Sequence, residues 1–162
     1  MLQNSAIKYI ADATAFYAGL VFKDVIVYTT PQVIDEVKHI KKGYALIDTL
    51  IDAGIINITE PEEYHLDKAK ELAEKSGELD KLSDADLSII ALALALRYEV
   101  ITDDYAIINI LKQNGIKVKN IINKRFKKVG RWIRYCKGCK VSYKDGNICK
   151  RCGNKLVRKL VS

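Results

Sequence analysis

The sequence lacks most features of disordered, membrane-spanning or exported proteins. It has only two prolines in 162 residues, so long disordered stretches are not expected. Its longest apolar run, 89–96, ends at Arg97 and is much shorter than the ~20 residues that cross a bilayer. The N-terminus has no basic segment followed by an apolar core, as a signal peptide would. We expect a soluble protein that acts in the cytoplasm and has no membrane partner.

Acidic residues are almost absent from residue 117 onward. Residues 1–116 hold 11 Lys and Arg against 19 Asp and Glu, a net charge of −8, whereas residues 117–162 hold 16 basic residues against Asp145 alone, a net charge of +15. An acidic body with a strongly basic tail predicts that the tail binds a polyanion. A disordered or solubilising tail is the alternative. An anionic membrane fits less well, because the tail also holds all four cysteines.

Short β-branched runs alternate with helical patterns over the first 120 residues. Thr30-Pro31 is typical of a helix start, and Ser83-x-x-Asp86 is typical of a capping box. The alternation predicts an α/β domain over 1–122, with a doubly wound, mainly parallel sheet. The predicted strands are 6–11, 25–28, 55–58, 99–102 and 117–122, and the predicted helices are 14–18, 31–41, 44–53, 62–76, 83–97 and 104–114.

The four cysteines form two C-x-x-C pairs, Cys136 with Cys139 and Cys149 with Cys152. Two thiolates one turn apart suit a zinc knuckle, and four thiolates favour one tetrahedral, structural Zn²⁺. Because so short a segment cannot build a core, metal binding would supply its folding energy. We expect a zinc ribbon with a basic tail over 135–162. Two disulfides or an iron–sulfur cluster are the alternatives, whereas a thioredoxin-like redox site does not fit the context.

Acidic residues follow the carboxyl ends of the predicted strands, where an open parallel sheet binds ligands. Clustered carboxylates repel one another and persist mainly where divalent cations neutralise them. Cations held in this way can activate water for phosphodiester cleavage. An Asp near a helix start can equally serve as a cap, whereas Glu36 lies beyond the first turn of its helix. The acids concerned are Asp12, Glu36, Asp84, Asp86, Asp103 and Asp104.

Four segments resemble, in order, the motifs of PIN nucleases. Asp12-Ala13-Thr14 is similar to the opening motif, and Pro31-x-x-x-x-Glu36-Val37 is similar to the second. The segment 82–93, LSDADLSIIALA, resembles the third, and Ile101-Thr102-Asp103-Asp104-Tyr105 resembles the fourth. With the four-cysteine ribbon that follows, the chain resembles the archaeal form of the Nob family over nearly its whole length.

The resemblance implies a metal-dependent endoribonuclease that trims the 3′ end of small-subunit ribosomal RNA in precursor ribosomal particles, using Mg²⁺ or Mn²⁺. It implies that the catalytic metal ligands are Asp12, Glu36, Asp86 and Asp104. Asp84 and Asp103 are extra acids beside the motif positions, and Thr14 and Thr102 match hydroxyls that often line the site. We set aside Tyr17, His39 and His65 as catalytic bases.

The basic stretch 123–134 is interpreted as a linker that binds the RNA backbone. Within it, Trp132 could stack on a base or anchor against the neighbouring domain, and both interpretations stay open. Two other functions also stay open: a PIN toxin ribonuclease, which the ribbon argues against, and a non-catalytic RNA-binding ribosome-assembly factor. The predicted RNA-binding residues are Lys124, Arg125, Lys127, Lys128, Arg131, Trp132 and Arg134.

Overall fold

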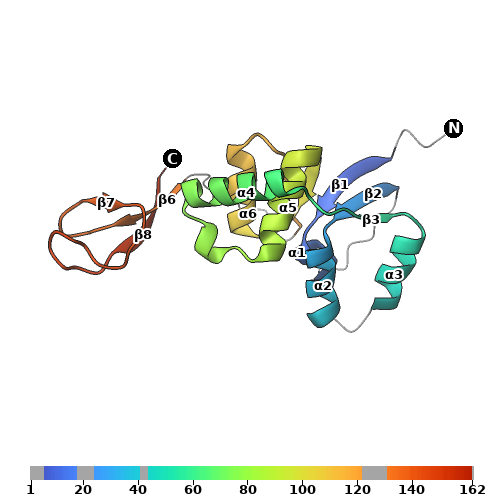
Figure 1. Ribbon diagram of the computed structural model, residues 1–162, viewed down its shortest axis with the longest axis horizontal. Coiled ribbons are helices and arrows are strands. Elements are labelled where there is room, and N and C mark those ends of the chain that lie inside the picture. Colours follow the sequence, from blue (N-terminus) through green and yellow to red (C-terminus); the bar gives the residue numbers. More distant parts are fainter. Residues whose placement is uncertain (1–5, 18–23, 41–43, 122–130, 162) are drawn as a thin grey trace.

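The computed structural model describes residues 6–17, 24–40, 44–121 and 131–161 (Figure 1). Each strand and helix predicted for the first 122 residues is present, although the last strand is shorter than predicted. The elements of this part are β1 (Ile7–Ala11), α1 (Ala13–Tyr17), β2 (Val25–Thr29), α2 (Pro31–Ile40), α3 (Tyr44–Asp52), β3 (Ile56–Ile58), α4 (Glu63–Ser76), the 3₁₀ turn η2 (Leu79–Lys81), α5 (Asp84–Leu96), β4 (Glu99–Ile101), α6 (Tyr105–Gln113) and β5 (Val118–Lys119).

The first sheet is parallel throughout, with the strand order β3-β2-β1-β4-β5. The order reverses between β1 and β4, which pair with Ile10 opposite Val100 and Ala11 opposite Ile101. All four of these side chains are buried, since β1 and β4 run through the centre of the sheet. A reversal of this kind is where doubly wound sheets bind ligands, at the carboxyl ends of the strands.

Helix α5 is buried almost throughout its length, because it packs against β1, α2, α4 and α6. It begins with the predicted capping box, in which Ser83 Oγ accepts from Asp86 N and Asp86 Oδ2 accepts from Ser83 N. The cap fixes where the helix starts and therefore places Asp84 and Asp86 in its first turn. Across the described ranges, no helix combines the length and the apolarity needed to cross a membrane.

The C-terminal module is a small antiparallel sheet of β6 (Arg131–Tyr135), β7 (Ser142–Tyr143) and β8 (Val157–Val161), in the order β7-β6-β8. The linker predicted at 123–134 is therefore wrong at its C-terminal end, because residues 131–134 belong to β6. The strand forms by pairing with β8, which lies more than twenty residues further along the chain, so the local pattern did not reveal it. Residues 123–130 of the predicted linker lie outside the described residues.

Candidate active site and metal centre

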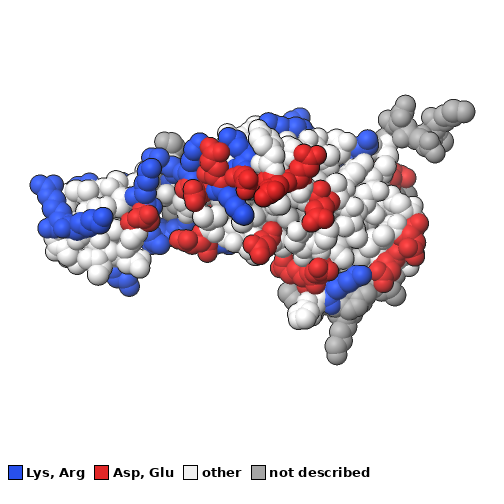
Figure 2. Space-filling view, viewed as in Figure 1, with Lys and Arg blue, Asp and Glu red and all other residues white. Residues whose placement is uncertain are grey.

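The four acids of the PIN motifs come from four separate segments of the fold, and their negative charges act on one another. Asp12 follows β1, Glu36 lies in the second turn of α2, Asp86 lies in the first turn of α5, and Asp104 caps α6. Burial, followed by the negative charges of Asp86 and Asp104, raises the pKa of Glu36. Figure 2 shows acidic side chains gathered where Figure 1 places α1, α2 and the start of α5.

Asp12 lies at the buried centre of this cluster, with only 3% of its surface exposed. Its Oδ1 accepts from Thr14 Oγ1 at 2.6 Å and from Ala15 N at 3.3 Å, and its Oδ2 accepts from Thr102 Oγ1. Burial raises the pKa of Asp12 to about 6, against these hydrogen bonds, and the charge of Asp104 adds to the rise. Both threonines of the motifs thus orient this one carboxylate.

Asp86 and Asp104 each combine a capping role with a place in the cluster. Asp104 Oδ1 accepts from Ala106 N at 2.9 Å and Ile107 N at 3.3 Å, and Asp86 Oδ2 accepts from Ser83 N at 2.9 Å. Burial and then the charge of Asp86 raise the pKa of Asp104, so the two carboxylates lie close enough to repel. Capping occupies one oxygen of each residue in these bonds. The structural and the metal-binding interpretations are therefore compatible.

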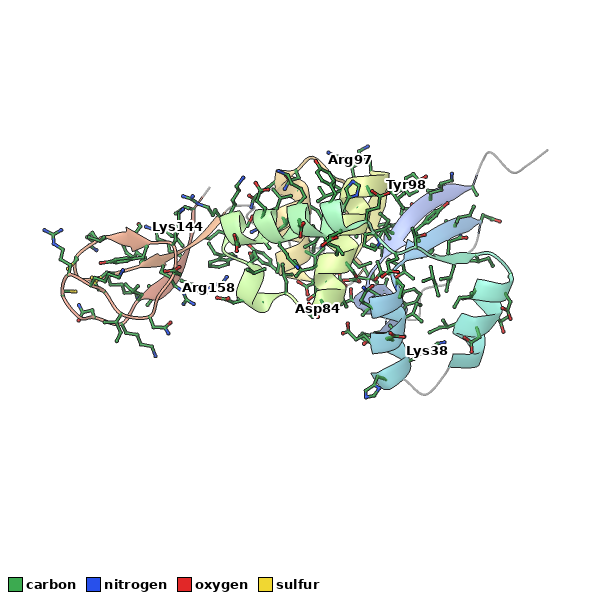
Figure 3. All side chains as sticks on the ribbon, in the orientation of Figure 1. Lys38, Asp84, Arg97, Tyr98, Lys144 and Arg158 are labelled. Carbon is green, nitrogen blue, oxygen red and sulfur yellow. The ribbon has the colours of Figure 1, made fainter. Side chains whose placement is uncertain are left out.

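The two extra acids are placed differently. Asp103 Oδ1 accepts from Ile121 N at 2.8 Å, and its own N–H donates to Thr14 Oγ1 at 3.1 Å, so its carboxylate holds the chain that follows β5. Asp84 is exposed at the start of α5, where Figure 3 labels it.

Two further side chains lie beside the cluster, and neither was selected from the sequence. Burial and then the charges of Glu36 and Asp12 raise the pKa of Tyr17. Tyr17 is three residues after Thr14 on α1, and this spacing, which puts both on one face of a helix, was the available signal. The charge of Lys81, in η2, is among the causes that lower the pKa of Asp104. No local pattern pointed to it.

These carboxylates form a donor set that fits a divalent cation. The fold holds Asp12, Glu36, Asp86 and Asp104 together although burial and mutual repulsion penalise their negative charges. A hard cation with oxygen ligands would remove that penalty, whereas neutral or soft-metal chemistry would not use such donors.

The four cysteines form a tighter cluster. Their Sγ atoms all lie within 4.8 Å of one another. Cys136 and Cys149 are buried, and all four thiols are free of disulfides. The Sγ atoms of Cys136 and Cys152 are 3.4 Å apart, well beyond the ~2.05 Å of an S–S bond. The arrangement fits a metal with four thiolate ligands.

The two C-x-x-C loops are built alike. The residue after each pair, Lys140 or Gly153, has a positive φ, and its N–H donates to the carbonyl of the first cysteine at 2.9 Å. The glycine at 153 adopts this conformation without strain, whereas Lys140 adopts it with a side chain. Tyr143 Oη lies 3.2 Å from Cys149 Sγ, and this contact is the largest cause that lowers the pKa of that thiol to about 6, whereas Cys152 is the largest cause that raises the pKa of Cys139 to about 12. The thiolate form that metal ligation requires is therefore favoured at Cys149, and a bound cation would have to stabilise it at Cys139.

Of the predicted RNA-binding residues, the structure describes only Arg131, Trp132 and Arg134. Lys124, Arg125, Lys127 and Lys128 lie outside the described residues. Arg131 is exposed on β6 and Arg134 is half-buried, and both line a cleft of about 870 Å³ between α4 and the C-terminal sheet. Figure 2 shows that Lys and Arg predominate on the C-terminal module.

Trp132 packs against the neighbouring domain. Its ring meets Tyr105 of α6 edge to face, with ring centres 6.3 Å apart, and the guanidinium of Arg158, from β8 of its own sheet, lies 4.5 Å from the centre of the ring. Of the two roles left open by the sequence, this geometry favours docking over base stacking.

Comparison with known proteins agrees with this arrangement. Residues 9–96 match the family described as the PIN domain of ribonuclease. The chain is 38% identical to endoribonuclease Nob1 of Pyrococcus abyssi over 151 residues, covering 91% of each protein. It is 33% identical to endoribonuclease Nob1 of Methanothermobacter thermautotrophicus, covering 94% of this chain and 92% of that protein. Ribonuclease VapC1 of Thermoplasma acidophilum is 35% identical over 127 residues, or 78% of this chain and 64% of that protein.

Proposed function

Because this chain belongs to the Nob1 family of PIN-domain endoribonucleases, we propose that it matures ribosomal RNA. The chain is a metal-dependent endoribonuclease. Its substrate is the small-subunit rRNA precursor, cut at the 3′ end in precursor ribosomal particles of the cytoplasm. The main support for this proposal is the similarity to Nob1 proteins over both modules, including the ribbon.

The acid cluster is the proposed catalytic site. Asp12, Glu36, Asp86 and Asp104 would hold one or two Mg²⁺ or Mn²⁺. Such a cation supplies a Lewis acid that activates water and stabilises the leaving oxygen. The protein contributes preorganisation, because the caps of α5 and α6 hold two of the carboxylates and two threonine hydroxyls hold Asp12.

The cysteine cluster would hold one structural Zn²⁺. The chain supplies all four ligands, so no position is left for water or substrate. The sheet of the module is small, and the buried residues grouped with Leu156 are two of the cysteines themselves. Metal ligation therefore provides most of the stability of the ribbon.

Binding of the RNA falls to the basic part of the chain. Sixteen Lys and Arg from residue 117 onward, with one acid among them, give this part of the chain a net charge of +15, whereas residues 1–116 have a net charge of −8. Phosphate contacts from these residues would supply affinity, and the acid cluster would supply the chemistry.

A ribonuclease of the VapC type is the second candidate, favoured by the similarity to VapC1. The two proposals differ in substrate. Incubating the protein with precursor rRNA, with and without Mn²⁺, and mapping the ends separates them. We expect one Mn²⁺-dependent cut at the mature 3′ end, absent with Asp12→Asn. Cleavage at many unrelated sites, or only in other RNAs, would contradict the proposal.

A further inference from the structure

Glu78 is an acidic residue buried at the junction between the two modules, with 0% of its surface exposed. It follows Gly77 at the end of α4, and its Oε1 accepts from Asn109 Nδ2 at 3.0 Å. Its Oε2 lies 3.5 Å from Nη2 of Arg158, which belongs to β8 of the ribbon. A buried carboxylate of the nuclease domain is thus paired with a cation of the other module. Figure 3 labels Arg158 where the C-terminal sheet meets the helices.

Arg158 makes two more contacts at this junction. Its Nη2 donates to the carbonyl of Gly77 at 2.9 Å, and its guanidinium covers the Trp132 ring. Gly77 itself leaves no room for a side chain, because a Cβ there would overlap the carbonyl oxygen of Trp132. The backbone of β6 therefore passes directly against the end of α4. Both side-chain and main-chain atoms are therefore in contact at this junction.

The docked tryptophan also contacts two residues close to Asp104 of the acid cluster, namely Tyr105 and Lys81. Its ring meets Tyr105, the residue that follows Asp104 in the chain. Lys81 Nζ lies 5.5 Å from the centre of the same ring, and its charge also acts on Asp104. Trp132, on β6, thus contacts the residue that directly follows Asp104, a proposed metal ligand.

We propose that Arg158 is a positioning residue, which fixes the ribbon against the nuclease domain through Glu78 and the Gly77 carbonyl and so sets the distance between ribbon-bound RNA and the acid cluster. Removing one partner of a buried ion pair leaves an uncompensated charge. The available relief is to open the junction and hydrate Glu78, which would turn a rigid arrangement into a flexible tether. The effect on RNA rests on the proposed function, whereas the docking does not.

The docking can be measured without RNA, because Trp132 is the single tryptophan of the chain. Arg158→Gln should shift its fluorescence to longer wavelength, increase its quenching by acrylamide and give the two modules separate tumbling times in NMR relaxation. Lys159→Gln is the matched control, since it removes the same charge from the next residue, which is exposed and covers Tyr135 instead. Arg158→Lys should restore the docking only in part, because lysine lacks the planar fork.

Two further substitutions test the same contact from the nuclease domain. Gly77→Ala and Gly115→Ala both place a side chain at positive φ, but only the first would meet Trp132. Gly77→Ala should expose Trp132, and Gly115→Ala should not. Glu78→Gln combined with Arg158→Gln should expose Trp132 no more than Arg158→Gln alone, as expected for partners of one interaction.

With precursor rRNA, Arg158→Gln should lower kcat/KM roughly tenfold, as a misplaced substrate does. Its cuts should spread over neighbouring bonds, while its zinc content and RNA affinity match those of Lys159→Gln. Unchanged fluorescence and tumbling in Arg158→Gln would overturn the proposal. So would a released ribbon with cleavage at the native bond and the native rate. If the wild-type protein does not cut precursor rRNA, the proposed function fails, and the RNA-free measurements still decide whether Arg158 docks the ribbon.

Discussion

Replacing Asp12 with asparagine should abolish cleavage and also stabilise the metal-free protein at neutral pH. The carboxylate is buried, and its pKa rises from 3.8 to about 6 in the folded state. Between these two values the folded chain binds more protons at Asp12 than the unfolded chain does. Its stability therefore falls as the pH rises through this window, and the loss is complete above pH 6.

The size of this loss follows from the shift. A rise in the pKa of Asp12 from 3.8 to about 6 lowers the free energy of unfolding by about 3 kcal/mol at pH 7.5. Asparagine does not titrate, so the variant avoids the loss. Its amide keeps an oxygen for Thr14 and Ala15, but an NH₂ group would replace the oxygen that accepts from Thr102. We allow about 1 kcal/mol for that mismatch, so the net gain is about 2 kcal/mol.

Urea unfolding followed by far-ultraviolet circular dichroism tests this at pH 4.5 and 7.5, in buffer without divalent cations. We expect the variant to be the more stable protein at pH 7.5, with a smaller difference at pH 4.5. Adding Mn²⁺ should stabilise the wild type and leave the variant almost unchanged, because binding to the folded state raises stability only where the site is complete. A variant that is less stable than the wild type at pH 7.5 would refute the reasoning, and so would cleavage at the wild-type rate.

Three further predictions concern the other parts of the chain. Cys149→Ser should unfold the ribbon and leave the α/β domain folded, with zinc analysis falling from one atom per chain to none. Asp104→Asn should abolish cleavage, whereas Asp103→Asn should retain it and only loosen the segment after β5, as hydrogen exchange at Ile121 would reveal. If a third of the 16 cations from residue 117 onward contact phosphates, log affinity should fall with log salt with a slope of roughly −3 to −4, and a chain ending near residue 122 should give a shallow slope. Equal slopes for both chains would exclude the tail as the RNA-binding element.

Features that depend on neighbours in the chain could be predicted from the sequence. The capping box at Ser83 and Asp86 formed as its spacing indicated, because its two hydrogen bonds join residues three apart. The alternation of strand and helix could be predicted for the same reason, because the spacing of apolar residues that marks a strand or a helix lies within that one element. The alternation in turn predicted the parallel sheet. The C-x-x-C pairs also indicated a four-thiolate cluster, which the structure contains. The PIN motifs in their order indicated the family.

Features that depend on which distant segments meet were decided by the tertiary structure. Asp103 and Asp104 are adjacent in sequence, yet Asp103 Oδ1 accepts from Ile121 N, after β5, whereas Asp104 caps α6 and lies close enough to Asp86 for that charge to raise its pKa. The strand at 131–135 exists through its pairing with β8. The buried pair of Glu78 and Arg158 joins residues that are eighty positions apart. Local patterns carry no record of such contacts, since their free energy arises only when folding removes both partners from water.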